Sequence, residues 1–226
     1  NGATDDLTVA GIDSIVFKPA DDIEANAILI EYNNDIATVR HNITSEYFNV
    51  NVNGADVEII SEASIEGLQY YLSGSTTNGS FSLESDMPYE VILNNTEITS
   101  LTNVPLNLSK NVERNIIIAN GTTNILSDSE DSDGKAVINS KGATNISGFG
   151  SLTINANKKH GISSDNDINI NGATISINHS ADASKGLKSD CNIMITDGDV
   201  NIVSSGTLTL EALDLGYDAT YCTSIG

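Results

Sequence analysis

The sequence predicts an all-β protein, a parallel β-helix in which each coil takes about 25 residues. Residues 161–165 (Gly-Ile-Ser-Ser-Asp) return 25 positions later as residues 186–190 (Gly-Leu-Lys-Ser-Asp), and the Ile and Val positions after each copy keep the same offset. A fixed period with units too short to bury their own apolar face is typical of a solenoid. Within each unit, short runs of alternating apolar and polar residues are separated by Gly, Asn, Asp and Ser, which favours strands over helices.

Two dipeptides in the repeat, Asn171-Gly172 and Asp197-Gly198, would also suit the turns of antiparallel hairpins. Hairpins do not require equal offsets along whole units, whereas a parallel coil does. The parallel β-helix is therefore the preferred fold.

Residues 1–47 are the least regular part of the chain and are expected to form an N-terminal β cap, with strands at 28–30 and 36–39. An open solenoid end exposes its core and a backbone edge that would pair with other chains, so it needs a cover. Residues 48–226 are expected to form the β-helix as one continuous domain. The last coil looks unfinished, which leaves open whether the native chain continues or whether this end packs on a partner protein.

The earlier coils keep the same period. Val57, Phe81 and Leu106 are separated by 24 and 25 residues. The run from Asp128 to Gly134 lengthens one coil. It lacks the turn glycine and the closing glutamate of an EF-hand loop, so it is expected to be a solvated, charged loop.

Composition narrows the function. The chain carries 31 Asp and Glu against 10 Lys and Arg, a net charge of −21, which argues against nucleic acid as a partner and suits a hard divalent cation such as Ca²⁺. No run of about 18 apolar residues is present, so no transmembrane segment is expected. The chain begins at Asn1 rather than Met and is expected to be a mature or trimmed secreted form. Cys191 and Cys222 form either a cross-coil disulfide or buried thiols, and both alternatives stay open.

Four aspartates are the candidate calcium ligands. Asp165 and Asp190 end equivalent strands one coil apart, which would bring their carboxylates within roughly 4.8 Å of each other. Stacked like charges are destabilising unless they are neutralised, and Ca²⁺ would do this by accepting several carboxylate and carbonyl oxygens. Asp167 and Asp182 are close enough in the unit to contribute. Alternatively, these residues are solvated corners of the coil.

Basic residues gather beside these aspartates. Lys158, Lys159 and His160 precede the first Gly-Ile strand, and Lys185 and Lys188 flank the second copy. Their cationic side chains are expected to contact an acidic polysaccharide. In a second interpretation, Lys185 or Lys188 removes the proton α to a uronate carboxylate in a β-elimination, and in a third the cations only screen neighbouring carboxylates.

One tyrosine is expected to add a sugar contact. Tyr70 and Tyr71 are adjacent, so in a strand they point to opposite sides and at most one of them serves a given surface. Tyr70 is the candidate.

Two segments resemble a known family. Residues 151–168 (SLTINANKKHGISSDNDI) resemble the G-S-L-T-V-N-G-N-x-x-D-G-I-x-S-x-D-D-L signature of secreted bacterial right-handed parallel β-helix proteins that are labelled carbohydrate-binding and are similar in architecture to pectate and polygalacturonate lyases. Residues 89–99 (YEVILNNTEIT) resemble an earlier coil of the same family, Y-x-I-x-L-N-G-V-x-I-T. The resemblance spans about residues 70–205.

The resemblance implies a right-handed coil, calcium-assisted binding of plant cell-wall polysaccharide with acidic pectin-type chains as ligands, and a secreted or cell-surface location, with a lipid anchor as one means of attachment. It is also consistent with cell-adhesion roles. Two positions depart from the family pattern: His160 and Ser184-Lys185 stand where the family has an Asp before Gly-Ile. One carboxylate in each coil is therefore missing.

The sequence as a whole predicts a calcium-dependent, non-catalytic polysaccharide-binding protein. Two other classes stay open. A structural adhesin or spacer would contact protein through the unfinished coil, and a polysaccharide lyase would need a basic residue beside the metal.

Overall fold

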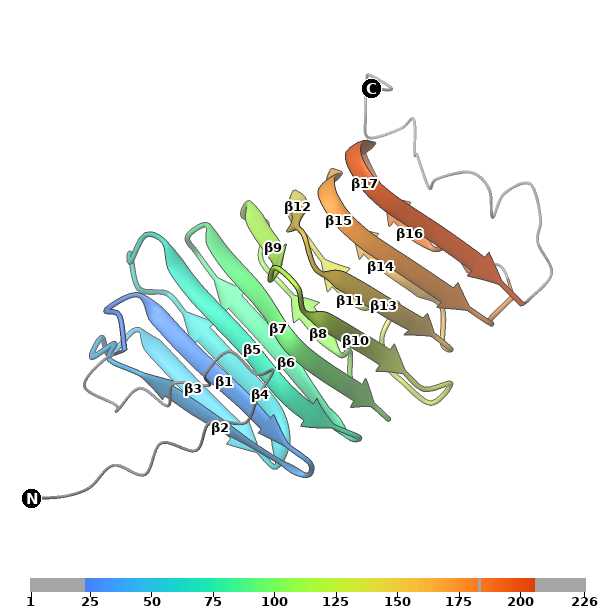
Figure 1. Ribbon diagram of the computed structural model, residues 1–226. Coiled ribbons are helices and arrows are strands. Elements are labelled where there is room, and N and C mark those ends of the chain that lie inside the picture. The colour runs from blue at the N-terminus through green and yellow to red at the C-terminus, as the bar shows by residue number, and fades with distance from the viewer. Residues whose placement is uncertain (1–22, 183, 206–226) are drawn as a thin grey trace, which may run out of the picture.

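The structure, a computed structural model, describes residues 23–182 and 184–205. Within these ranges the regular secondary structure consists of β-strands alone, and the strands stack as a parallel β-solenoid of about six turns. Figure 1 shows the stack running from β2 and β3 at one end to β16 and β17 at the other. The predicted fold class is confirmed.

Seventeen strands make up this part of the chain. They are β1 (Ala27–Asn33), β2 (Ile36–His41), β3 (Phe48–Asn53), β4 (Ala55–Ser61), β5 (Leu68–Thr76), β6 (Gly79–Ser85), β7 (Tyr89–Ser100), β8 (Leu106–Leu108), β9 (Arg114–Ile118), β10 (Thr123–Asp128), β11 (Ala136–Ser140), β12 (Thr144–Gly148), β13 (Ser151–Ala156), β14 (His160–Ser164), β15 (Ile168–His179), β16 (Leu187–Ser189) and β17 (Ile193–Ser204).

The strands form two sheets. We call sheet B the seven-stranded sheet in the order β16-β14-β11-β8-β6-β4-β3, and sheet A the ten-stranded sheet that holds the others. From β7 onwards, each turn gives sheet A either one long strand, as in β7, β15 and β17, or two short ones, as in β9–β10 and β12–β13. A bend divides each of these turns, and a residue with a left-handed φ stands in every bend, from Asn95 (54°) to Gly198 (100°).

The core is a narrow column of stacked aliphatic side chains. Ile162 pairs with Leu187, Ile168 with Ile193 and Ile175 with Val200, so the 25-residue offset of the sequence is the spacing between neighbouring turns. Ile162, Ile168 and Ile175 are completely or almost completely buried. Removing a buried side chain of this size from water stabilises a fold by about 1.5–3 kcal/mol, which explains how the solenoid folds with few aromatic residues.

At the N-terminal end, one antiparallel strand is added to each sheet. β2 pairs antiparallel with β1, and β3 pairs antiparallel with β4, whereas β1 and β4 themselves run parallel to β5 and β6. These are the only antiparallel pairs among the described strands. The domain boundary at residue 47 stays a prediction, and both Cys222 and the end of the last coil lie outside the described residues.

The acidic loop differs from its expectation at its first residue. Asp128 ends β10 at an inward-facing position and is only 3% exposed, so the prediction of a wholly solvated run is wrong there. Its Oδ1 accepts hydrogen bonds from the backbone N–H groups of Asn157 (2.6 Å) and Lys158 (3.2 Å) in the next turn. Burial raises the pKa of Asp128. Glu130 and Asp133 are exposed, as expected.

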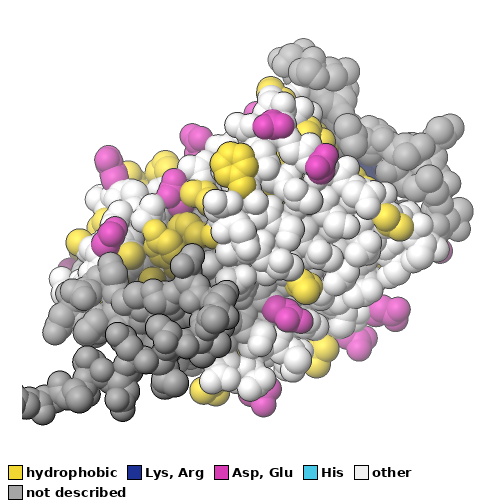
Figure 2. Space-filling view, viewed as in Figure 1, with side chains coloured by type: hydrophobic (Ala, Val, Ile, Leu, Met, Phe, Trp, Pro, Cys, Tyr) yellow, Lys and Arg dark blue, Asp and Glu magenta, His cyan; other side chains and the backbone are white. Residues whose placement is uncertain are grey.

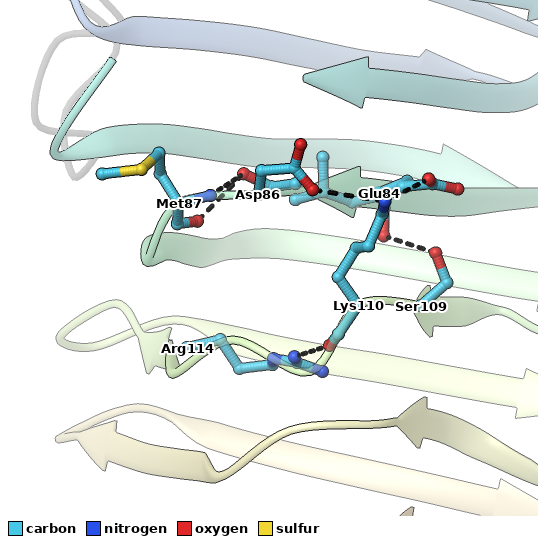
Figure 3. Close-up of polar contacts among 8 residues, drawn as sticks. Glu84, Asp86, Met87, Ser109, Lys110 and Arg114 are labelled. Carbon is cyan, nitrogen blue, oxygen red and sulfur yellow. Dashed lines mark hydrogen bonds and ion pairs between the residues drawn. The ribbon is translucent and has the colours of Figure 1, made fainter. Parts of the chain in front are cut away.

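Polar side chains fasten the turn between β8 and β9 (Figure 3). Arg114 is fully buried, and its guanidinium donates to the carbonyl oxygen of Lys110 (Figure 3). It also donates to the carbonyl oxygens of Leu108 (3.0 Å) and Val112 (2.6 Å). Lys110 itself reaches the preceding turn, where its Nζ lies 2.9 Å from Glu84 and 3.2 Å from Asp86. The buried cation thus has backbone carbonyls in place of a carboxylate partner.

Candidate functional site

An open groove of about 450 Å³ crosses the N-terminal half of sheet B. We call it the sheet B groove. Its walls come from β3, β4, β6 and β8 and from the loops that precede β8 and β11. The lining residues are mostly amides, hydroxyls and carboxylates: Asn51, Asn53, Asp56, Val57, Glu58, Ser80, Ser82, Asn103, Val104, Asn107 and Asp133.

The groove offers both donors and acceptors. Asp56 accepts a hydrogen bond from the Ser80 hydroxyl (2.6 Å), whereas the exposed carboxylates of Glu58 and Asp133 have no hydrogen-bond partner or ion pair in the described part of the chain. Carboxylates are strong acceptors for hydroxyl groups, and carboxamides both donate and accept. No Lys or Arg lines the groove. Such a surface suits a ligand rich in hydroxyl groups.

A straight row of outward side chains leads from the groove along sheet B. Glu58 pairs in register with Ser82, Ser82 with Asn107, and Asn107 with Asn139; the register line then continues through Ser163, which is only 4% exposed, to Lys188. Asn139 donates to Asn107 (2.9 Å) and Asn107 to Ser82 (3.2 Å), so the amides form a ladder. Because neighbouring strands lie about 4.8 Å apart, the row is a regular polar track along the solenoid axis.

The predicted basic residues come together at the other end of this track. Lys158 is not counted with them, since its Nζ donates a hydrogen bond to the Glu130 carbonyl oxygen (2.8 Å). Lys159 precedes His160 in the chain, the Lys185 backbone N–H donates to the His160 ring, and Lys188 is the register partner of Ser163 on the same strand as His160. We call Lys159, Lys185 and Lys188 the basic patch.

Two of the predicted sugar contacts are buried. Tyr70 is 0% exposed and packs against Phe81 and Tyr89, with ring centroids 6.0 and 5.8 Å away, so the prediction that its ring meets a sugar is wrong. His160 is also buried, and its Nδ1 accepts a hydrogen bond from the Lys185 backbone N–H (3.0 Å). Burial, followed by the neighbouring lysines, lowers the pKa of His160 to about 4, so at neutral pH it brings no charge to the patch.

The predicted calcium ligands occupy the expected backbone positions. Asp165 and Asp190 follow equivalent strands, and their N–H groups each donate to the preceding turn (both 3.0 Å). The Asp190 carboxylate, however, pairs with Lys188, and Asp167 accepts from the backbone and side chain of Asn192 (2.9 and 3.0 Å). Asp182 is exposed. Residues 23–182 and 184–205 contain no group of three or more His, Cys, Asp or Glu arranged for a metal ion.

The face formed by the sheet A strands has a different character. In the view of Figure 2, which has these strands in front, the surface is mainly uncharged and polar, with isolated Asp and Glu side chains and almost no Lys or Arg. Lys188 of the basic patch lies on β16, a strand of sheet B. No helix of membrane-spanning length and hydropathy occurs among the described residues.

The comparisons with known proteins agree with this polar surface. The model of the carbohydrate-binding domain-containing protein family matches residues 53–215. The chain belongs to this family. The resemblance noted in the sequence is thereby confirmed, and carbohydrate binding is the function that this membership supports.

Two known proteins are similar to this chain, one in sequence and one in structure. A carbohydrate-binding domain-containing protein of Acetivibrio thermocellus is 28% identical over 141 residues, which are 57% of this chain and 49% of the relative, so the chain spans about half the length of that relative. The structure of a polysaccharide lyase-like protein from C. thermocellum, solved as a gadolinium derivative, superposes with a TM-score of 0.65 at 23% identity. The match covers 81% of this chain and 75% of the other, and it shows a shared fold.

Sequence reasoning missed most of the groove. Asn53, Asp56, Asn103 and Asp133 come from four separate segments, and only the register of the turns brings them together. The one usable signal was the alternation in β4, where Asp56 and Glu58 stand between the buried Ala55, Val57 and Ile59 and must therefore face outward.

Proposed function

We propose that this protein is a non-catalytic module that binds a polysaccharide chain along the outer face of sheet B. The observation that carries the proposal is the sheet B groove, where the amide of Asn107 and two carboxylates without a partner among the described residues, those of Glu58 and Asp133, face one opening. Sugar hydroxyls would donate to these groups and accept from the amides. The track from Glu58 to Asn139 continues the same chemistry over the following turns, which favours a polymer over a single sugar.

We propose an acidic, pectin-type chain as the ligand because the two ends of the track differ in charge. Lys159 and Lys185 of the basic patch would attract uronate carboxylates, while Lys188 is already paired with Asp190; Asp56 and Glu58 in the groove would repel such carboxylates. Calcium enters the proposal as the bridge between groove carboxylates and uronates, since it accepts several oxygens in irregular geometry. A secreted or surface location, where such polymers occur, belongs to the same proposal.

Affinity electrophoresis tests the proposal. Wild-type protein would be run through native gels cast with polygalacturonate, and separately with hydroxyethylcellulose, first with Ca²⁺ and then with EGTA. The expected result is retardation in polygalacturonate that EGTA abolishes. Retardation by hydroxyethylcellulose alone would replace the pectin-type ligand with a neutral glucan, and migration unchanged in every gel would overturn polysaccharide binding in favour of an adhesin or spacer.

Two matched variants locate the binding surface. Glu58→Gln removes an exposed carboxylate from the groove, and Glu97→Gln removes an equally exposed one from the outside of sheet A. Loss of retardation only in Glu58→Gln is expected. A lyase would instead release unsaturated products from polygalacturonate, detected by their ultraviolet absorbance, and Lys188→Ala would abolish that signal.

A further inference from the structure

The bend that divides sheet A carries one feature that the proposed function does not use. Phe149 lies between β12 and β13 and is 78% exposed, the largest exposed fraction among the large apolar side chains of the described chain. Phe48 and Phe81, the other phenylalanines in the described ranges, are buried. A single exposed apolar residue is ordinary on a protein surface, so exposure alone assigns no role to Phe149.

The backbone that presents Phe149 is locked in place. Gly148 has a φ of +112°, and a Cβ on it would lie 2.1 Å from the carbonyl oxygen of Ile118 in the preceding turn. On the other side, a Cβ on Gly150 would lie 2.3 Å from the carbonyl oxygen of Ala119. Both glycines thus press the Phe149 segment onto the turn before it. The ring is held outward on a rigid element, a form of pre-organisation that lowers the entropic cost of binding.

Equivalent bends in the neighbouring turns expose polar side chains. These are Asn94 and Asn120 on the N-terminal side and Asn171 and Asp197 on the C-terminal side. We call these four residues together with Phe149 the bend ridge. Registered pairs Leu93–Ile118 and Ile118–Gly148 align the bends on the N-terminal side of Phe149, and Ser147–Asn171 and Asn171–Asp197 align those on its C-terminal side. Asn120 and Asn171 lie one turn from Phe149, and Asn94 and Asp197 lie two turns from it, at about 4.8 Å per turn.

The amides of the bend ridge differ from those of the ladders. The side-chain amides of three other asparagines donate hydrogen bonds to neighbouring turns: Asn107, Asn139 and Asn155. The side chains of Asn94, Asn120 and Asn171 make no hydrogen bond within the described part of the chain. Their donors and acceptors are available to a ligand on both sides of the aromatic ring.

We infer that the bend ridge is a second glycan-binding surface, on which Phe149 stacks against one pyranose ring and the flanking asparagines hydrogen-bond to the hydroxyls of neighbouring sugars. The axial C–H groups of a pyranose form an apolar face that packs flat on an aromatic ring, while its hydroxyls point sideways. The spacing of the turns is close to the length of one sugar in a polymer. Because the ridge carries Asp197 and no cation, it does not favour an acidic chain, and its ligand is an uncharged polysaccharide. The inference rests on carbohydrate binding but not on the sheet B groove.

The chain contains no Trp, so Phe149→Trp gives a single fluorophore at the ridge. Tyr47→Trp is the matched control, since Tyr47 is 56% exposed but precedes β3, away from the bends. Each variant would be titrated with cellohexaose, xylohexaose and hexagalacturonate. A saturable blue shift of Phe149→Trp with a neutral hexasaccharide, and none of Tyr47→Trp, is the expected result.

A second measurement separates the ridge from the groove. Phe149→Ala should unfold at the wild-type urea concentration but bind the neutral hexasaccharide about fivefold more weakly, in line with an aromatic stacking contact. Glu58→Gln should leave the Phe149→Trp response unchanged. Two results would overturn the assignment of the ridge as a glycan-binding surface: Phe149→Trp fluorescence that does not change with any of the three sugars, or a Phe149→Ala variant that binds the neutral hexasaccharide like wild type. Retardation by polygalacturonate would remain a separate test of the groove.

Discussion

Gly148→Ala should destabilise the solenoid by about 2–4 kcal/mol, whereas Gly121→Ala in the equivalent bend one turn earlier should cost about 1 kcal/mol. Both glycines have a positive φ, of +112° and +70°. They differ in their surroundings. A Cβ on Gly121 would meet nothing within 4 Å, but one on Gly148 would lie 2.1 Å from the Ile118 carbonyl oxygen. The Gly121 variant therefore measures the cost of a left-handed φ without a close contact.

The additional cost at Gly148 follows from the pairing of β12 with β9. Gly148 is the register partner of Ile118, so relieving the contact must push the two strands apart by about 1 Å or more and weaken the hydrogen bonds between them. A lost backbone hydrogen bond costs roughly 1 kcal/mol, and the strained φ adds 1–3 kcal/mol. Urea unfolding followed by far-ultraviolet circular dichroism would measure both variants. Equal losses in the two variants would refute the close approach between these turns.

Three further predictions follow from buried polar groups. Arg114→Met should cost about 3 kcal/mol in urea unfolding, because the carbonyls of Leu108 and Val112 lose a charged donor, while the surface control Lys110→Met should leave the unfolding midpoint unchanged. The pKa of His160 is lowered to about 4 in the folded state, so the unfolded chain binds the extra proton and stability should fall as the pH drops from about 6.5 to 4. His160→Asn keeps an acceptor for the Lys185 N–H and should flatten that decline in urea unfolding measured across this pH range. An unchanged slope would contradict the prediction. Burial raises the pKa of Asp128, so the folded state holds the proton more tightly and stability should decrease as the pH rises through that pKa. Asp128→Asn should remove this pH dependence of stability. A wild-type-like pH profile in the variant would count against the buried position of Asp128.

The repeating part of the fold could be predicted from the sequence because the period appears directly in the apolar positions. Offsets of 25 residues between Ile162 and Leu187, or between Ile175 and Val200, are the registered pairs of adjacent turns. The antiparallel pairing of β2 and β3 lies outside this repeat, and a cap has no period from which a register can be derived. The position of Asp128 was recoverable in principle, since it occupies the inward register position of Ala156 and His179 in the next two turns.

The binding surface was harder to predict than the fold. Alternation within β5 places Tyr70 between the buried Leu68 and Leu72, which indicates a core position rather than a sugar contact. Lys188 and its neighbours do lie together, because the one-turn offset that relates them is part of the repeat. The groove depends instead on loops before β8 and β11, whose lengths and paths follow no repeat. Sequence patterns therefore predicted the position of the basic patch better than that of the hydrogen-bond acceptors in the sheet B groove.

Chemical-shift mapping tests the central claim most directly. ¹⁵N-labelled protein would be titrated with hexagalacturonate in the presence of Ca²⁺. If a polysaccharide binds along sheet B, the backbone amides of Asn53, Glu58 and Asn107 should shift together and saturably, with smaller changes towards Lys188. Unchanged amides along the whole of sheet B at saturating hexagalacturonate, or shifts confined to other surfaces, would contradict the assignment of this face as the glycan-binding site.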